Sequence, residues 1–130
     1  MSDPRRRADP GGRGERGAVT AETAMALPLL VAVTIGLVWL LAVGAAQVRV
    51  VDAARETARA AARGDSDAEA LALGRQVAPD GAEVSVASTG DRVRASAAAP
   101  VAGPGGLFGF LPTVTVRAEA VAASEQRDAG

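Results

Sequence analysis

A run of 26 residues without a charged side chain, from Thr23 to Val48, is the feature that most limits how this chain can fold. The part between residues 24 and 46 consists mostly of Ala, Leu and Val. A helix rises about 1.5 Å per residue, so roughly 20 apolar residues cross the hydrocarbon core of a bilayer. We therefore predict one membrane-spanning helix, with its span at about residues 24–46.

Other interpretations explain this part of the sequence less completely. A cleavable secretory signal has an apolar region of only about 7–15 residues before a small-residue cleavage site. Gly44-Ala45-Ala46 would provide the site, but the run is too long. A plain signal anchor explains the length of the run but not the acidic residue that precedes it. Arg5-Arg6-Arg7 does not form a twin-arginine signal, because a polar, Gly-containing stretch follows in place of an apolar region.

Small residues also occur four apart within the run, at Ala32 with Gly36 and at Ala42 with Ala46. This is the spacing of helix-packing faces in membranes. An alanine-rich segment produces the same spacing by chance, so the sequence favours neither interpretation.

Charge is distributed unevenly around the apolar run. Residues 1–17 contain five Arg and three acidic residues, a net charge of +2, whereas the remaining residues contain nine Arg and twelve acidic residues, a net charge of -3. Basic flanking segments stay in the cytoplasm. We therefore predict a cytoplasmic N-terminus and place residues 49–130 outside the cell membrane. The acidic remainder also argues against nucleic acid as a partner, because nucleic-acid-binding surfaces are basic.

The residue types present exclude most catalytic chemistry. The chain contains no Cys, His or Tyr, and all 14 of its basic residues are Arg. Disulfides, thiolate and imidazole metal ligands, and histidine or lysine general bases are therefore excluded. We expect a protein that is not an enzyme, with no metal site, no cofactor and no small-molecule substrate.

Glu22 lies immediately before the apolar run, where a carboxylate is costly. A charge held in apolar surroundings costs a few kcal/mol or more unless it is paired, and such residues are candidates for function. The nearest basic residue is Arg16, six positions earlier, and no other follows before Arg49. Cleavage after Gly17 would create an ammonium group on Ala18. That group could pair with Glu22 of a neighbouring helix displaced by about one turn.

The residues around Glu22 resemble the start of a type IV prepilin. An Arg-rich leader ends at Gly17, four residues (Ala18–Ala21) follow, and Glu22 then opens a long apolar helix. In that class a membrane aspartyl peptidase removes the leader after the Gly, and the Glu neutralises the terminal amine of an adjacent subunit. The resemblance therefore implies cleavage between Gly17 and Ala18, and a role for Glu22 in assembly and axial register.

Within this class the chain is most similar to the TadE-like minor pilins or pseudopilins of Tad (Flp) pili, over residues 13 to about 63. The major Flp pilins are much shorter and follow the Glu with Tyr, whereas this chain has Thr23 and about 80 residues beyond the span. The resemblance implies four partners: prepilin peptidase, other pilin subunits, the pilus assembly machinery and membrane lipid.

We accordingly interpret the chain as a processed, single-pass minor pilin or pseudopilin that takes part in Tad pilus assembly and enters an extracellular pilus. The alternative is a signal-anchored envelope protein with a small external binding domain that does not polymerise.

The helix is predicted to continue beyond the membrane, from about Thr20 to Arg63. On a helical wheel the charged residues between 49 and 63 fall within about 120° and leave an apolar face opposite. Gly64 is a natural stop. The apolar face consists of Val50, Val51, Ala54, Ala58 and Ala61.

A short second helix is predicted from Ser66 to about Val77. Ser66 and Glu69 have the spacing of a capping box, which marks a helix start. Gly74 is expected to weaken this helix.

Apolar and polar residues then alternate in three segments. The first two flank a turn at Thr89–Asp91 and predict a hairpin, and Thr113–Ala120 predicts a third strand. The expected fold class is α+β. It comprises a leader (1–17), a long helix (18–63), a small extracytoplasmic α+β domain (64–123) and a disordered tail (124–130). About 60 residues bury little apolar area, so the sheet needs the alanine face of the long helix, or a neighbouring subunit.

Two further segments are notable. Residues 1–16 are expected to be disordered, like the tail. The connection at 100–112 contains an apolar cluster, which is unusual for a loop. This cluster either caps the open core of the sheet or is offered to a partner or the membrane surface; it consists of Leu107, Phe108, Phe110 and Leu111.

Overall fold

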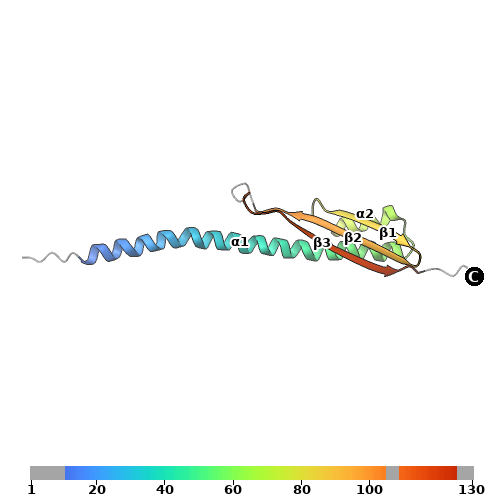
Figure 1. The fold of residues 1–130 in the computed structure, drawn as a ribbon, viewed down its shortest axis with the longest axis horizontal. Helices are drawn as coiled ribbons and strands as arrows, with labels where there is room; N and C mark the ends of the chain where they lie inside the picture. Colours follow the sequence, from blue (N-terminus) through green and yellow to red (C-terminus); the bar gives the residue numbers. More distant parts are fainter. Residues whose placement is uncertain (1–10, 105–108, 126–130) are drawn as a thin grey trace, which may run out of the picture. The chain divides into compact units, whose positions relative to one another are not determined.

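The computed structural model of the chain describes residues 11–104 and 109–125 (Figure 1). The residues up to Leu37 and those from Val38 onward form two separate units. The long helix is followed by a short helix and a three-stranded antiparallel sheet, which confirms the predicted α+β class. The elements are α1 (Gly11–Ala62), α2 (Asp67–Val77), β1 (Glu83–Thr89), β2 (Arg92–Val101) and β3 (Val114–Ala123).

The helix α1 begins earlier than the sequence led us to expect. Residues 11–16 were expected to be disordered, but they are helical. Extending a helix that already exists avoids the cost of nucleation, and Arg and Glu are good helix formers. Residues 11–16 therefore continue the helix of the apolar run.

The end of α1 is set by Gly64, as predicted. Its φ angle is +98°, a conformation that glycine adopts without the steric cost of a Cβ. The N–H of Gly64 donates to the carbonyl of Ala61 (3.1 Å), and the N–H of Asp65 donates to the carbonyl of Ala60 (3.2 Å). These two bonds form a Schellman motif, which satisfies carbonyls at the end of the helix.

The start of α2 also follows the sequence pattern. Ser66 is the N-cap, and its hydroxyl accepts a hydrogen bond from the N–H of Glu69 (3.3 Å). The carboxylate of Glu69 accepts in return from the N–H of Ser66 (3.0 Å). The predicted capping box is therefore confirmed.

The sheet has the order β1-β2-β3, and its register determines which residues face the core. Val84 of β1 pairs with Ala97 of β2, and Ala97 pairs with Ala118 of β3. Alternate residues along β2 are buried: Val93, Ala95, Ala97 and Ala99. The hairpin and the third strand are confirmed, although β3 continues to Ala123 instead of ending near residue 120.

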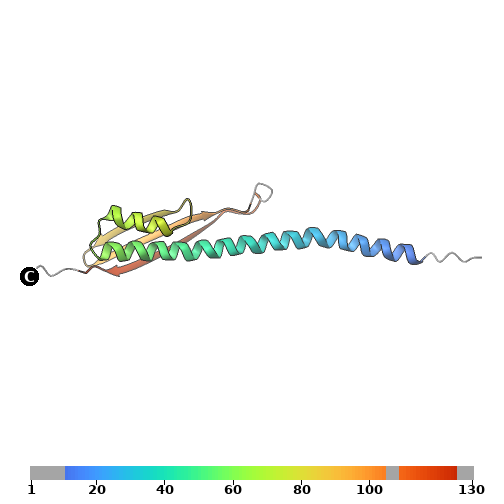
Figure 2. The same ribbon diagram turned by 180° about the vertical axis from the view of Figure 1, so that it is seen from behind.

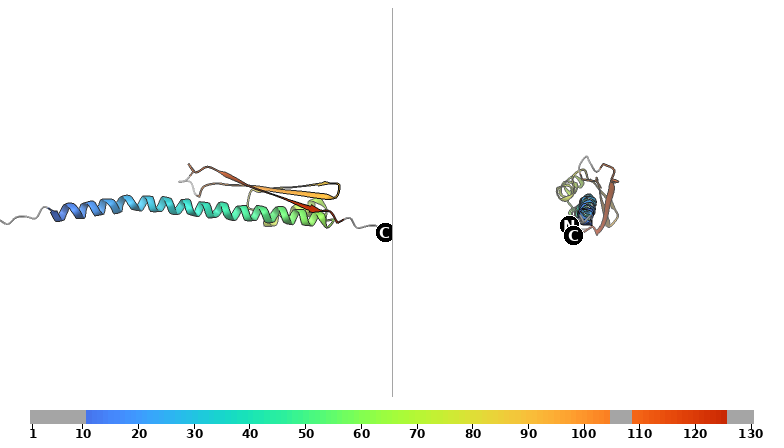
Figure 3. Two further views of the ribbon diagram at one scale, coloured as in Figure 1. Left: turned by 60° about the horizontal axis from the view of Figure 1, so that its bottom comes forward. Right: turned by 90° about the vertical axis from the view of Figure 1, so that its left-hand side faces the viewer.

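The core forms where the second half of α1 packs on this sheet. Ala46, Val50, Ala53 and Ala54 of α1 join residues of all three strands in one hydrophobic cluster. Both helices lie on the same face of the sheet (Figure 3), and α2 lies alongside α1 (Figure 2). The sheet therefore uses the alanine-rich face of its own helix. The compact unit begins within α1, at Val38, and not after it.

Two hydrogen bonds link α1 to β3 and to the residue two positions after it. The side-chain amide of Gln47 donates to the carbonyl of Arg117 (3.1 Å), and the N–H of Glu125 donates to the carbonyl of Ala62 (3.1 Å). Together with the packing of α1 against β3 in the core, these bonds hold the strand to the helix.

Candidate processing and docking site

The three residues that the sequence assigned to processing and assembly all lie within α1 and are exposed to solvent. Gly17 and Ala18, which flank the proposed cleavage point, are helical. Glu22 follows Ala18 by four residues, so both lie on the same side of the helix, about 6 Å apart along its axis. The peptide bond between Gly17 and Ala18, where the sequence predicts cleavage, therefore lies about one helical turn before Glu22.

Glu22 forms no ion pair within residues 11–104 and 109–125. The ion pairs found there join Glu56 with Arg59, Arg63 with Asp65, and Arg94 with Glu119. The spacing from Arg16 to Glu22 is six residues, whereas side chains meet on a helix at spacings of three or four. The described part of the chain thus supplies no cation for Glu22, and a partner would have to come from elsewhere.

Polar side chains near Glu22 are satisfied within the helix. The hydroxyl of Thr20 donates to the carbonyl of Arg16, and that of Thr23 donates to the carbonyl of Val19, both at 2.9 Å. Thr34 does the same with Leu30 at 2.8 Å. Since lipid offers no hydrogen-bond partners, these local bonds let the hydroxyls enter apolar surroundings at little cost. The carboxylate of Glu22 cannot donate a hydrogen bond to a backbone carbonyl in this way.

The apolar part of α1 is long enough to cross a membrane, and it is the one such helix among the described residues. Its large side chains are exposed; Met25 and Leu41, for example, are 80% and 74% accessible. Within the compact unit, which begins at Val38, Val43 and Ala46 pack into the core, although Leu41 stays exposed. The last residues of the predicted 24–46 span thus belong to the core. These features are consistent with a single-pass membrane protein.

This packing also bears on the two pairs of small residues. Ala46 is 8% accessible and lies in the core cluster, so the pair that it forms with Ala42 is not a free membrane-packing face. Gly36, the second member of the other pair, has nothing within 4 Å of the position that a Cβ would occupy.

The apolar cluster in the connection before β3 is only partly described. Phe110 is 76% accessible and Leu111 is half-buried, and neither belongs to the core cluster. Leu107 and Phe108 lie outside the described residues. Whether this cluster caps the core or contacts a partner therefore stays a prediction.

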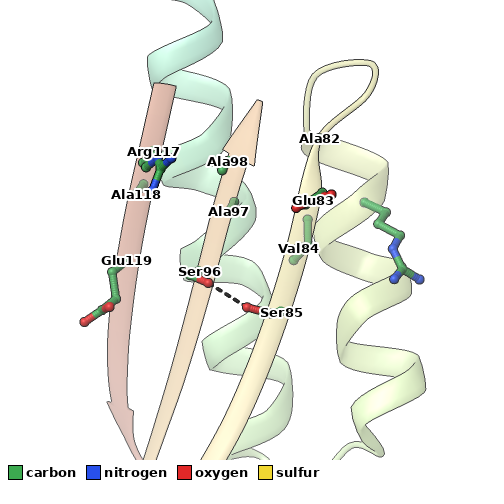
Figure 4. Close-up of a pocket in the computed structure, with 11 residues that line it drawn as sticks. Ala82, Glu83, Val84, Ser85, Ser96, Ala97, Ala98, Arg117, Ala118 and Glu119 are labelled. Atoms are coloured by element: carbon green, nitrogen blue, oxygen red, sulfur yellow. Dashed lines mark hydrogen bonds between the residues drawn. The ribbon is translucent and has the colours of Figure 1, made fainter. Parts of the chain in front are cut away.

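The outer face of the sheet forms a site that the sequence analysis did not single out. Figure 4 shows side chains of all three strands around a groove of about 800 Å³. At its centre the hydroxyls of Ser85 and Ser96 are hydrogen-bonded at 2.6 Å, and Arg94 pairs with Glu119 at 3.2 Å on the same face. The other residues that line the groove include four alanines: Ala82, Ala97, Ala98 and Ala118. Along the strands, polar residues alternate with the residues that are buried in the core. This alternation in the sequence could have identified the outer face of the sheet.

Two kinds of functional group can be checked in the groove. The chain contains no His to activate a serine hydroxyl. Among the described residues, no three acidic, His or Cys side chains are placed to hold a metal ion. This face carries small side chains and residues of both charges, so it is suited to contacts with another surface.

Together these features describe a protein with a candidate membrane-spanning helix, an acidic residue at the head of that helix and a small α+β unit that is partly built from it. Residues 17–59 match the family model described as TadE-like protein, which confirms the resemblance found in the sequence. The match begins at Gly17 and covers about a third of the chain; it includes Glu22 and most of α1, whereas α2 and the sheet lie outside it. No curated protein and no solved structure matches the chain.

Proposed function

We propose that this chain is a minor pilin or pseudopilin of a Tad pilus, cut between Gly17 and Ala18 by a prepilin peptidase. The observation that carries the proposal is the placement of Glu22. It lies one turn after the proposed cleavage point, in a segment that matches TadE-like proteins, and it has no cation within the described part of its own chain.

Cleavage would remove the energetic problem that Glu22 poses. A carboxylate next to lipid costs several kcal/mol unless a cation is nearby. The new ammonium of Ala18 lies about 6 Å from Glu22 along the helix axis, since the two are four residues apart. If a neighbouring helix is displaced by one turn, the ammonium of one subunit comes level with Glu22 of the next. Pairing would then stabilise the assembled helices and set their axial stagger.

Orientation follows from the charges. The Arg-rich leader stays in the cytoplasm, where the peptidase reaches it, and the compact unit lies on the outer side of the membrane. Before assembly the exposed apolar part of α1 lies in lipid, and after assembly its side chains pack against other pilin helices. The partners are the peptidase, membrane lipid, other pilin subunits and the assembly machinery. The external unit primes, caps or modulates the fibre by docking, not by catalysis.

Sequencing of the mature N-terminus tests this proposal. The full chain is produced in cells with and without a prepilin peptidase, and the protein from each is sequenced and weighed by intact mass. A start at Ala18 that depends on the peptidase is the expected result. An intact leader in the presence of an active peptidase would contradict the proposal and favour a signal-anchored envelope protein that does not polymerise.

A further inference from the structure

The proposed cleavage point lies inside a helix, which is a difficulty for any peptidase. In α1 the carbonyl of Gly17 belongs to the helical hydrogen-bond ladder. The carbonyl of Arg16, one residue earlier, also accepts the hydroxyl of Thr20 at 2.9 Å. A peptidase must present the scissile carbonyl to its catalytic groups, and helical bonds hide it. The first turns of α1 must therefore open before the Gly17–Ala18 bond is cut.

Glycines are concentrated in these first turns without a packing reason. An added Cβ would meet nothing within 4 Å at Gly12, Gly14 or Gly17. None of the three has a positive φ angle, unlike Gly64. Alanine would thus fit each site in the folded structure and would favour the helix about fivefold more than glycine. The described structure explains Gly64 and Gly74 by conformation and close approach, but it gives no reason for these three.

The distribution of glycine along α1 points to the same end of the helix. From Ala18 to Ile35 the chain contains no glycine, and the next is Gly36. Ala, Leu and Glu, which are good helix formers, make up half of residues 18–35, and the one strong helix breaker there, Pro28, lies ten residues after Ala18. Opening of the helix is therefore favoured before Gly17, in the leader, and opposed after it, in the part that becomes the mature helix.

We propose that Gly12 and Gly14 determine how readily α1 opens at the Gly17–Ala18 bond, and therefore how fast the leader is removed. This inference rests on the proposed function, because it concerns the same processing step. Gly12 and Gly14 act on the peptide bond through the helix and are positioning residues. A weak leader helix lets the peptidase bind an extended substrate while Glu22 and the apolar helix stay folded.

The test compares initial cleavage rates of the full-length chain in detergent micelles with a purified prepilin peptidase. If opening precedes cleavage, Gly14→Ala slows it by up to about fivefold and the Gly12→Ala/Gly14→Ala variant by up to about 25-fold, since each added alanine favours the helix by that factor. Gly36→Ala is the matched control. It also adds a Cβ into open space on α1, but beyond the cleavage point, and its rate should equal that of the unmodified chain.

A third substitution separates helix opening from direct fit to the peptidase. Asn is larger than Ala but a poorer helix former, so Gly14→Asn should be cut faster than Gly14→Ala. Amide hydrogen exchange at residues 14–22 should slow in the alanine variants in the same order as their cleavage. Equal rates for the unmodified chain and Gly12→Ala/Gly14→Ala would overturn the inference, as would slower cleavage of Gly14→Asn than of Gly14→Ala. If the unmodified chain is not cut at all, the proposed function fails as well.

Discussion

Replacement of Gly74 by Ala tests the contact between α2 and α1. A Cβ at this position would overlap the hydroxyl oxygen of Thr57. It would also lie 3.2 Å from the carbonyl oxygen of Ala53 and 3.2 Å from a methyl group of Val84. The Ala53 oxygen is part of the backbone of α1 and cannot move aside. Thr57 is fully buried, and its hydroxyl donates to the same oxygen at 2.8 Å.

The expected magnitude follows from two opposing effects. Alanine in place of glycine within a helix stabilises by about 1 kcal/mol. Forcing an extra methyl group into a packed interior destabilises by about 1–3 kcal/mol. Because the overlap at Gly74 involves a fully buried side chain and a backbone atom, we expect the upper end of that range, and a net loss of about 2 kcal/mol.

The double variant Gly74→Ala/Thr57→Ala separates this clash from other causes. Removing the Thr57 hydroxyl clears the atom that the new methyl group meets most closely. The cost of Gly74→Ala should then fall by at least half, which corresponds to a coupling free energy of about 1 kcal/mol or more between the two sites. The contacts with Ala53 and Val84 remain, so the relief is incomplete.

The assay is urea unfolding of the full chain in detergent, followed by hydrogen exchange of the β2 amides, which report on the core. Gly44→Ala is the control, because a Cβ there meets nothing within 4 Å and should not destabilise. The reasoning is refuted if Gly74→Ala is as stable as the unmodified chain, or if Thr57→Ala does not reduce its cost.

Three further predictions concern the assembly residue, the core and the helix cap. Glu22→Gln keeps the shape of the side chain but removes its charge, so leader removal should stay near normal while pilus assembly falls; normal piliation, counted by electron microscopy, would contradict the pairing. Val50 is fully buried, so Val50→Ala should cost about 2 kcal/mol in urea unfolding, whereas Val48→Ala, at a residue 60% accessible, should cost little. Hydrogen bonds from the backbone N–H of Ser66, and then from its hydroxyl, lower the pKa of Glu69 below the ordinary 4.5. The stability that this carboxylate adds is therefore present above that ordinary value and is lost as the pH falls through the lowered pKa. Glu69→Gln should remove this part of the acid sensitivity, and an unchanged pH profile would show that the cap does not act in this way.

Much of the fold could be predicted because its signals are local. The stop at Gly64 and the capping box between Ser66 and Glu69 each depend on a few neighbouring residues. The strands were recognised from period-two alternation, which depends only on the two faces of the sheet. Errors arose at element ends, where local preference is weak. The start of α1 was placed near Thr20, whereas the helix begins at Gly11.

The candidate site was likewise predicted from chain order. Gly17, Ala18 and Glu22 are separated by a fixed number of residues, so their spacing on a helix follows once the helix is recognised. The outer face of the sheet was missed, since its groove requires three strands to be placed side by side.

The sequence alone determined the apolar run, the charge asymmetry around it and the spacing of Glu22 from Gly17 and Ala18, because these are properties of residue order. Only the tertiary structure decided which small residues serve as contacts. Gly74, which weakens its own helix, is the point where α2 approaches Thr57, and Ala46 belongs to the core instead of the membrane segment. The physical reason is that the hydrophobic pattern of a helix or strand specifies which of its faces must be buried. Which other part of the protein covers that face depends on how the whole chain packs.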